Sequence, residues 1–320
     1  MKNCILLTLL ISFLAGNVLG DTHFHDGGYY LIDYTINDNV WIDWASNPIP
    51  GTQMEIVTGG IINGWFNVYG YGDVTIDGGT LINYLSTHSN SNVTILNGTV
   101  GYFLGAKGNS NVTILDGVIH DELTASQTSN VTVYDGSIGA WVDTYHNSHV
   151  SIYGSIIIKH IYAEENSEIV IYGSFGSYGD LPVGSPVFIW PGHPDNVPSG
   201  HITGTLANGD PIDNDYYIFD NASITLVNYN AVRIVELGDL IVDEGALGNI
   251  DDEMEVSLLA KADAAFAALD KGNPNAAKVA MNDLKALINQ VEAQTGKKIT
   301  AKAAAEIIEC INAIIEDLDG

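Results

Sequence analysis

Residues Asn92 to Gly98 read Asn-Val-Thr-Ile-Leu-Asn-Gly, and residues Asn111 to Gly117 read Asn-Val-Thr-Ile-Leu-Asp-Gly. Nineteen positions separate these two stretches, and the same spacing links one β-branched residue in each of six successive units: Val74, Val93, Val112, Val131, Val150 and Ile169. A fixed period of this length is typical of a repeat architecture in which each unit packs on its neighbours. The repeat therefore decides the fold in the middle of the chain.

Each unit has the pattern of short strands separated by turns. Its first apolar pair alternates with polar residues, as expected for a strand with one buried face. An Asn-Gly or Asp-Gly step follows, and two further apolar positions recur in every unit, as at Val100 and Leu104. We predict a mainly β fold, a parallel β-helix of about 19 residues per coil. We expect the right-handed form, because left-handed β-helices run on hexapeptides and nineteen is not a multiple of six.

The flanks of the repeat are expected to be irregular coils of the same solenoid. Residues 54–56 align with residues 74–76 at a spacing of twenty, and residues 187–189 continue the series on the other side. Residues 202–209 have the pattern of a hairpin around Asn-Gly. We therefore assign residues 21–250 to a β-helix with an N-terminal cap and C-terminal closing strands.

The first twenty residues resemble a secretory signal peptide. Lys2 precedes an apolar run from Cys4 to Gly16, and Val18-Leu19-Gly20 suits cleavage before Asp21. The run is shorter than the roughly 20 residues that cross a bilayer comfortably. We expect residues 1–20 to be removed, leaving an exported chain without a membrane span. A retained anchor is the alternative.

Charge excludes two classes of partner. The chain has 39 acidic and 11 basic residues, a net charge of −28. Nucleic acids and anionic membranes attract basic patches, so we expect neither as a partner. After cleavage Cys310 is the one remaining cysteine, so we expect no internal disulfide.

The last seventy residues have a different composition, rich in Ala, Lys, Leu and Ile. Their apolar spacing predicts three helices, over 253–269, from the Asn273-Pro274 step, and from Thr300 onward. We assign residues 251–320 to a small helical bundle.

Two stretches of this bundle resemble the FIMAH domain. They are Asp270-Lys-Gly-Asn-Pro-Asn-Ala-Ala-Lys and Leu287-Ile-Asn-Gln-Val-Glu-Ala-Gln-Thr-Gly-Lys-Lys-Ile-Thr. The resemblance covers residues 253–318 and implies an exported bacterial multidomain protein, with no activity to transfer. The whole chain resembles a secreted bacterial β-helix repeat protein with a C-terminal FIMAH-like domain. The expected location is extracellular, or the surface of a bacterium.

Catalytic signals in the predicted solenoid are sparse. Its basic residues are Lys107, Lys159 and Arg233, too few and too scattered for a lyase of acidic polymers, and Asp121-Glu122 is one adjacent acidic pair. We therefore favour a non-catalytic secreted or surface-associated protein of the structural or adhesion type, in contact with an extracellular polysaccharide or another surface component. The alternative is a polysaccharide-active β-helix enzyme, a lyase or a hydrolase.

One column of the repeat carries aromatic side chains. It precedes the third apolar position, has Glu122 in its middle, and otherwise contains Tyr84, Phe103, Trp141 and His160. Rings in a row stack on sugar rings, so these four residues are our candidate glycan contacts. The alternative is that they only stabilise neighbouring coils, as cross-strand pairs do.

Metal-binding signals are limited to two places, and neither makes a firm cofactor. Asp210, Asp213 and Asp215 offer oxygen ligands suited to Ca²⁺, although acidic loops are more often simply solvated. Cleavage before Asp21 would create the terminus Asp21-Thr22-His23, whose amine, amides and imidazole suit square-planar Cu²⁺ or Ni²⁺. Such termini are commonly just mobile.

Overall fold

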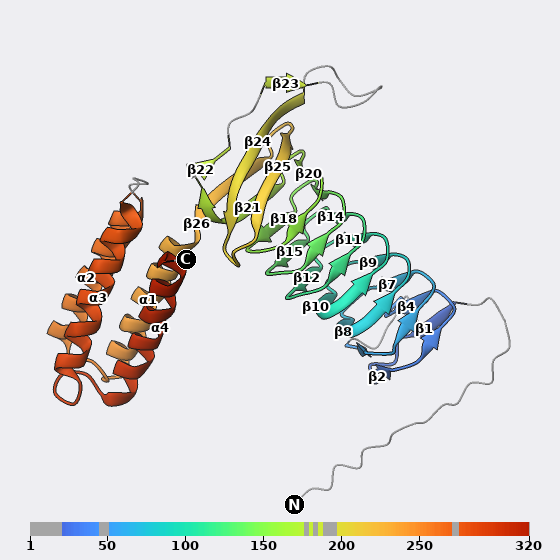
Figure 1. The fold of residues 1–320 in the computed structure, drawn as a ribbon. Helices are drawn as coiled ribbons and strands as arrows, with labels where there is room; N and C mark the ends of the chain where they lie inside the picture. Colours follow the sequence, from blue (N-terminus) through green and yellow to red (C-terminus); the bar gives the residue numbers. More distant parts are fainter. Residues whose placement is uncertain are drawn as a thin grey trace, which may run out of the picture.

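The chain forms a β-solenoid followed by a bundle of helices (Figure 1). This computed structural model describes residues 21–44, 51–175, 179–181, 185–187, 197–270 and 275–319. The predicted signal peptide and the Asn273-Pro274 step lie outside these residues. The predicted fold class is confirmed: the coils stack through parallel strands, and helices follow them.

Each regular coil contributes strands to three faces. The first face contains β2 (Tyr29–Ile32), β5 (Gln53–Val57), β8 (Asp73–Leu81), β10 (Asn92–Val100), β12 (Asn111–Ile114), β15 (Asn130–Val133), β18 (His149–Ile152), β21 (Glu168–Phe175) and β26 (Ser223–Asn228). The second contains β3 (Thr35–Ile36), β6 (Ile61–Ile62), the ends of β8 and β10, β13 (Val118–Ile119), β16 (Ser137–Ile138) and β19 (Ile156–Ile157). The third contains β1 (Thr22–Phe24), β4 (Val40–Ile42), β7 (Phe66–Val68), β9 (Leu85–Thr87), β11 (Leu104–Ala106), β14 (Leu123–Ala125), β17 (Val142–Thr144), β20 (His160–Ala163) and β25 (Pro211–Ile218).

The register of the strands follows the repeat. Val93 pairs with Val74 on one side and with Val112 on the other, as the spacing of nineteen requires. Met54 pairs with Val74, which confirms the predicted irregular coil before the repeat. Alternate side chains point inward, and the valine, leucine and isoleucine columns form one continuous core along the solenoid.

A column of buried serines also lies inside the coils. Ser91, Ser110, Ser129, Ser148 and Ser167 are each nineteen residues apart and are all buried. The Oγ of Ser148 donates to the carbonyl oxygen of Ala125 in the preceding coil, at 3.1 Å. Ser129 and Ser167 make the equivalent bond one coil earlier and one coil later. At these three positions the column ties a coil to the one before it.

The repeat ends differently from the prediction. Residues 187–189 were expected to follow β21 as the next coil, but Val187 belongs to β23 (Ser185–Val187), which pairs antiparallel with β24 (Val197–Leu206). Residues 188 and 189 lie outside the described residues. The position beside Ile169 is taken by Ile224, 55 residues later. An excursion of the chain thus separates the last two strands of the first face. The spacing of eighteen residues between Ile169 and Val187 suggested one more coil and did not reveal this excursion.

The excursion contains the predicted hairpin. β24 and β25 pair antiparallel around the Asn208-Gly209 turn, and β25 also joins the third face beside β20. The short β22 (Gly179–Asp180) pairs antiparallel with β26. These strands close the C-terminal end of the solenoid (Figure 1).

The helical region begins earlier than predicted and has four helices instead of three. They are α1 (Tyr229–Ala246), α2 (Asp252–Asp270), α3 (Ala276–Gln294) and α4 (Ala301–Asp319). Residues 229–246 were assigned to the β-helix and its closing strands. Gly238 and the β-branched residues of this stretch do have low helix propensity. The buried residues Ala231, Ile234, Leu237 and Ile241 nevertheless lie at helical spacing and pack into the bundle. Tertiary packing outweighs the weak propensity.

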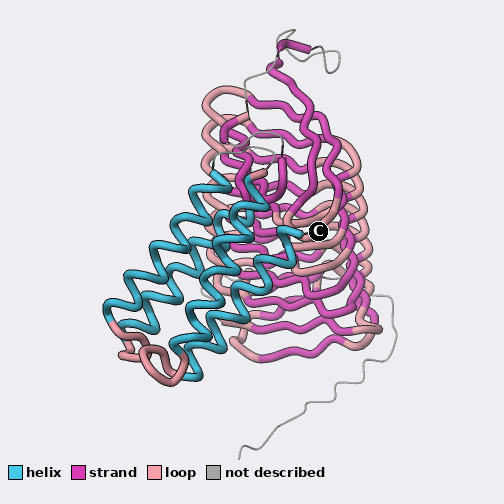
Figure 2. Tube along the Cα trace, turned by 60° about the vertical axis from the view of Figure 1, so that its left-hand side comes forward, coloured by secondary structure: helices cyan, strands magenta, loops and turns pink. Residues whose placement is uncertain are grey.

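The four helices run alongside one another and form their own core (Figure 2). The bundle joins the solenoid directly, since Asn228 ends β26 and caps α1 by accepting from the backbone N–H of Ala231. Tyr229 then places its ring edge against Tyr153 of the solenoid, with centroids 6.0 Å apart. Within the described parts of the chain, no helix is long and apolar enough to cross a membrane.

Candidate functional site on the third strand face

The third face holds the side chains that the sequence marks as candidates. Residues just before each of its strands, and the middle residue of each strand, project from the solenoid, because their neighbours in the strand point into the core. Nine strands lie side by side on this face. It is therefore a continuous surface along which one ligand could span many coils.

The predicted aromatic column divides into two parts. The rings of Tyr84 and Phe103 lie 5.9 Å apart, and those of Trp141 and His160 lie 6.4 Å apart. Glu122 occupies the coil between the two pairs, where its carbonyl oxygen accepts from the N–H of Leu104. The structure thus brings the four candidates together only in pairs.

Two more rings complete the first pair. Trp65 lies edge to face with Tyr84 at 5.9 Å, and Tyr102 lies edge to face with Tyr84 at 5.1 Å. Trp65 is 54% exposed and Tyr102 is 49% exposed. We call Trp65, Tyr84, Tyr102 and Phe103 the aromatic patch. Sequence reasoning missed Trp65, although it precedes Tyr84 by nineteen residues, because the repeat was aligned only from Val74 onward.

A second set of rings at the same end is packed differently. Tyr69 and His88 are parallel, with centroids 4.2 Å apart and planes 3° apart, and Trp41 also stacks on Tyr69, at 6.0 Å. Burial lowers the pKa of His88 to about 4, helped by the charge of Lys107. These rings cover one another's faces, as expected for a structural ladder along the coils.

The second pair of candidates lies in a more buried cluster. The His160 ring contacts Tyr217 of β25 at 5.4 Å, and the Nζ of Lys159 lies 5.8 Å from the centre of the Trp141 ring. Tyr162 and Tyr217 are buried, and Tyr145 and Phe219 pack against them. This aromatic cluster makes an apolar environment for the polar groups beside it.

The most perturbed carboxyl group of the face lies beside that cluster. Asp143 is only 4% exposed, and its Oδ2 accepts from the hydroxyl of Tyr145 at 3.3 Å. Its Oδ1 is buried without a hydrogen-bond partner. Burial, and then the charge of Glu122, raise the pKa of Asp143 to about 8.

Glu122 is the acidic neighbour of Asp143. The two carboxyl groups share a proton in a hydrogen bond, which also raises the pKa of Asp143. The Glu122 carboxylate accepts a second hydrogen bond from the hydroxyl of Thr124 at 2.5 Å. The sequence suggested Asp121 as the partner of Glu122, whereas the carboxyl group that Glu122 meets belongs to the next coil. Asp143 was missed because the repeats on either side have Thr124 and Tyr162 at its position.

The candidate metal ligands of the hairpin do not converge on one point. His201 lies between two of them, with Nε2 2.7 Å from Asp213 and Nδ1 2.9 Å from Asp215. These carboxylates raise the pKa of the exposed His201 side chain. Asp210 instead accepts from the side-chain amide of Asn208. The three aspartates are thus engaged with other side chains of the hairpin.

The N-terminal candidate is part of a strand. The backbone N–H of Thr22 donates to the carbonyl oxygen of Asn39 at 2.8 Å, and the His23 ring stacks on Trp41 at 6.3 Å. Copper bound through the amides of Asp21-Thr22-His23 would have to break this pairing. Over the described ranges, no group of three or more His, Cys, Asp or Glu side chains has the geometry of a metal site.

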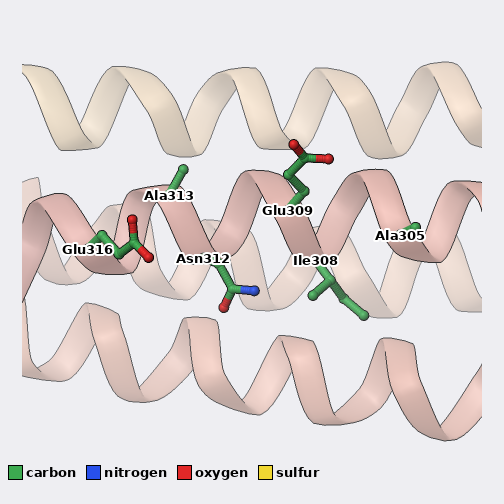
Figure 3. A pocket seen from close by; sticks show the side chains of 6 residues that line it. All are labelled: Ala305, Ile308, Glu309, Asn312, Ala313 and Glu316. Carbon is green, nitrogen blue, oxygen red and sulfur yellow. The ribbon is translucent and has the colours of Figure 1, made fainter.

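A shallow hollow also lies on the helical bundle. All of its lining residues lie on α4, as Figure 3 shows: Ala305, Ile308, Glu309, Asn312, Ala313 and Glu316. None of them belongs to the third face of the solenoid. The hollow therefore has no part in the aromatic and acidic surface described above.

The comparisons with known proteins concern the bundle. Residues 234–316 match the FIMAH domain family. The match begins inside α1 and ends inside α4, so it includes parts of all four helices and leaves the solenoid outside. Neither a curated protein nor a solved structure matches the chain.

Proposed function

We propose that the solenoid binds a neutral polysaccharide through the aromatic patch, and that the chain acts as a non-catalytic adhesion-type protein. A β-solenoid joined to a FIMAH domain is consistent with a surface or structural protein. The aromatic patch supplies the finer part of the proposal, because it is a cluster of partly exposed rings on a continuous face of the solenoid.

The arrangement of the rings is the observation that carries this proposal. Along the first face, Tyr134, Tyr153 and Tyr172 stack nearly parallel, at 14° and 4°, so each ring is covered by the next. In the patch the rings meet at 60° to 83°, and two of them are about half exposed. Edge-to-face packing leaves ring faces uncovered, and an uncovered face can lie against the apolar side of a sugar ring.

The ligand is expected to be neutral and extended. The chain has a net charge of −28, and Glu122 lies on the same face as the patch, so an acidic polymer would be repelled. Successive coils are spaced at about 4.8 Å, the distance between paired strands. The patch spans successive coils, which favours a polysaccharide lying along the solenoid axis.

The test compares variants of the aromatic patch with a variant of the stacked tyrosines on the first face. Co-sedimentation of the purified chain with insoluble neutral and acidic polysaccharides should show binding to a neutral polymer. Trp65→Ala and Tyr84→Ala should each weaken it at least tenfold, whereas Tyr134→Ala on the first face should bind like the wild type. Equal binding by all three variants would exclude the patch.

Two further measurements belong to the same assay. Phe103→Ala and Trp141→Ala separate the two pairs of the predicted column, and only Phe103→Ala should weaken binding if the patch alone is used. Newly released chain ends should not appear during incubation. Their appearance would show the alternative function, a polysaccharide-active enzyme.

A further inference from the structure

We propose that Trp41 and Asn67 hold the acetamido carbonyl oxygen of an N-acetylated sugar, so that the neutral polysaccharide of the proposed function carries N-acetyl groups. The inference rests on that function, because it names the class of sugar that the aromatic patch binds. The two residues lie side by side on the third face, where Trp41 of β4 is the register partner of Asn67 of β7.

Trp41 and Asn67 both have outward positions in their strands. The residues directly before and after each of them are fully buried in the core of the solenoid. Side chains alternate between the two sides of a strand, so the indole and the amide point away from that core. They therefore lie among the rings of the third face.

The polar hydrogens of these two side chains have no acceptor. The indole Nε1 of Trp41 and the amide Nδ2 of Asn67 are buried, and no atom of the described residues accepts from either. Asn67 as a whole is 8% exposed. Buried polar atoms in native proteins nearly always have a partner, and an unpaired one requires an explanation. Paired strands lie about 4.8 Å apart, which is short enough for one ligand oxygen to accept from both donors.

Aromatic rings flank the two donors. Trp65 of the aromatic patch lies two residues before Asn67, and Tyr69 lies two residues after it. The centroid of the Tyr69 ring is 6.0 Å from that of Trp41. The Trp44 ring contacts both, with centroids 4.5 Å from Tyr69 and 5.2 Å from Trp41. The site thus combines hydrogen-bond donors with apolar ring surfaces, as sites for small polar ligands do.

A ligand reaches the donors by displacing Trp44. This ring is 52% exposed, and it rests against the rings of Trp41 and Tyr69. Exposed side chains change rotamer within nanoseconds, and a sugar replaces the lost ring contacts with apolar contacts of its own. Burial of the two donors in the unliganded chain is therefore compatible with binding.

The two donors select the chemical class of the ligand. A carbonyl oxygen has two lone pairs and no hydrogen, so it accepts from both donors at once, whereas a sugar hydroxyl must also place its own hydrogen. The acetamido group of an N-acetylated sugar has such a carbonyl, and its methyl group packs on the flanking rings. A carboxylate offers the same kind of oxygen, but the net charge of −28 opposes an acidic polymer. A neutral N-acetylated sugar fits both the donors and the charge.

The experiment compares two insoluble polymers with the same backbone. Each sugar carries an acetamido group in chitin and a hydroxyl group at the same position in cellulose. Co-sedimentation of the purified chain should show at least tenfold tighter binding to chitin. Asn67→Asp keeps the shape of the amide but replaces its donor with an acceptor, so it should lose this preference. Trp41→Phe keeps a ring but removes the indole N–H, and it should have the same effect.

Asn92→Asp on the first face is the matched control, because it makes the same change of charge as Asn67→Asp. Asn92 is exposed, and its Oδ1 accepts from the side-chain amide of Asn111, as an aspartate oxygen also does. This variant should keep the preference of the wild type for chitin. Urea denaturation of the three variants shows which of them are folded, and only folded variants enter the comparison.

A measurement on the wild type tests the site even if a variant fails to fold. The chain has five tryptophans, and NMR resolves their indole N–H signals, of which that of Trp41 is assigned through its contact with the Tyr69 ring. Saturating chitotetraose should move the Trp41 signal downfield, because the N–H gains an acceptor. Cellotetraose at the same concentration should move it much less.

Three results would overturn the site. They are equal binding of the wild type to chitin and cellulose, a preference for chitin that survives in folded Asn67→Asp, and a Trp41 signal that saturating chitotetraose does not move. Loss of the preference in Asn92→Asp would also count against it, as an effect of charge alone.

These failures differ from a failure of the proposed function. If the wild type binds both polymers equally and Trp65→Ala weakens both, the N-acetyl site is wrong and the aromatic patch stands. If Asn67→Asp loses the preference for chitin while Trp65→Ala and Tyr84→Ala bind like the wild type, the patch is wrong and the site stands. Absence of binding to any polysaccharide would overturn both.

Discussion

The side-chain amide nitrogen of Asn214 lies 2.9 Å from the backbone carbonyl oxygen of Ile157 and donates a hydrogen bond to it. The same nitrogen donates to the carbonyl oxygen of Lys159, also at 2.9 Å. One coil earlier, the equivalent carbonyls of Ile138 and Ala140 accept from backbone N–H groups of the following coil. Asn214 therefore replaces two backbone donors at the point where the regular coils end.

Asn214→Ala should lower the stability of the solenoid. Asn214 is 3% exposed, so the variant leaves two inner carbonyls without a donor. An unsatisfied buried acceptor costs about 1–3 kcal/mol, and the free energy of unfolding should fall by about 2–4 kcal/mol. Urea denaturation measures this loss. Asn221→Ala, on an exposed turn, should change it by less than about 0.5 kcal/mol; equal losses would contradict the role of Asn214.

The serine column should also contribute to stability. The Ser148 Oγ donates to the carbonyl oxygens of Ala125 and Tyr145, at 3.1 and 2.8 Å. Ser148→Ala removes these bonds without changing the backbone, and should cost about 1–2 kcal/mol of unfolding free energy. Ser137→Ala, at an outward position of β16, is the control and should cost almost nothing. A neutral Ser148→Ala would show that the backbone N–H groups of Tyr145 and Ser148, which already donate to these carbonyls, are sufficient.

The carboxyl groups of Asp143 and Glu122 should make the free energy of unfolding depend on pH. The native pKa of about 8 exceeds the ordinary value of 3.8, because burial and then Glu122 disfavour the charged form. The native state thus holds a proton that the unfolded state releases. This contribution to stability is complete below about pH 4, declines as the pH rises, and is lost above about pH 8.

Urea denaturation at pH 4 to 9 measures this slope, and Asp143→Asn is its control. The variant should lose less stability than the wild type between pH 5 and 8, since the titrating group is absent. Identical pH profiles would mean that the native state does not raise the pKa of Asp143.

The stack formed by Tyr134, Tyr153 and Tyr172 should hold the helical bundle against the solenoid. Tyr153 stacks between Tyr134 and Tyr172 and meets Tyr229, the first residue of α1, edge to face. Tyr153→Ala should lower the free energy of unfolding by about 2–4 kcal/mol, through lost stacking and burial. It should also speed hydrogen exchange at the start of α1. Tyr102→Ala, in the aromatic patch, should leave that exchange unchanged.

Much of the third face could be predicted from the repeat. Residues nineteen apart in sequence become neighbours on adjacent coils, so Tyr84 and Phe103 had to lie together wherever the period held. The same arithmetic reaches Trp65, once the alignment is carried one coil further toward the N-terminus. Regular stacking makes sequence distance a measure of spatial distance, which is why the solenoid and its aromatic column were predictable.

Tertiary structure decided what happens where the period breaks or where burial matters. α1 forms because its apolar stripe packs on other helices, although Gly238 and its β-branched residues disfavour a helix. Asn214 meets Ile157 across 57 positions, a contact made by the excursion and not by the repeat. The nineteen-residue repeat is enough to specify the coil, its period and the residues on each face. Whether Asp143 is buried beside Glu122 depends on how neighbouring coils and the aromatic cluster exclude water, and only the folded chain decides that.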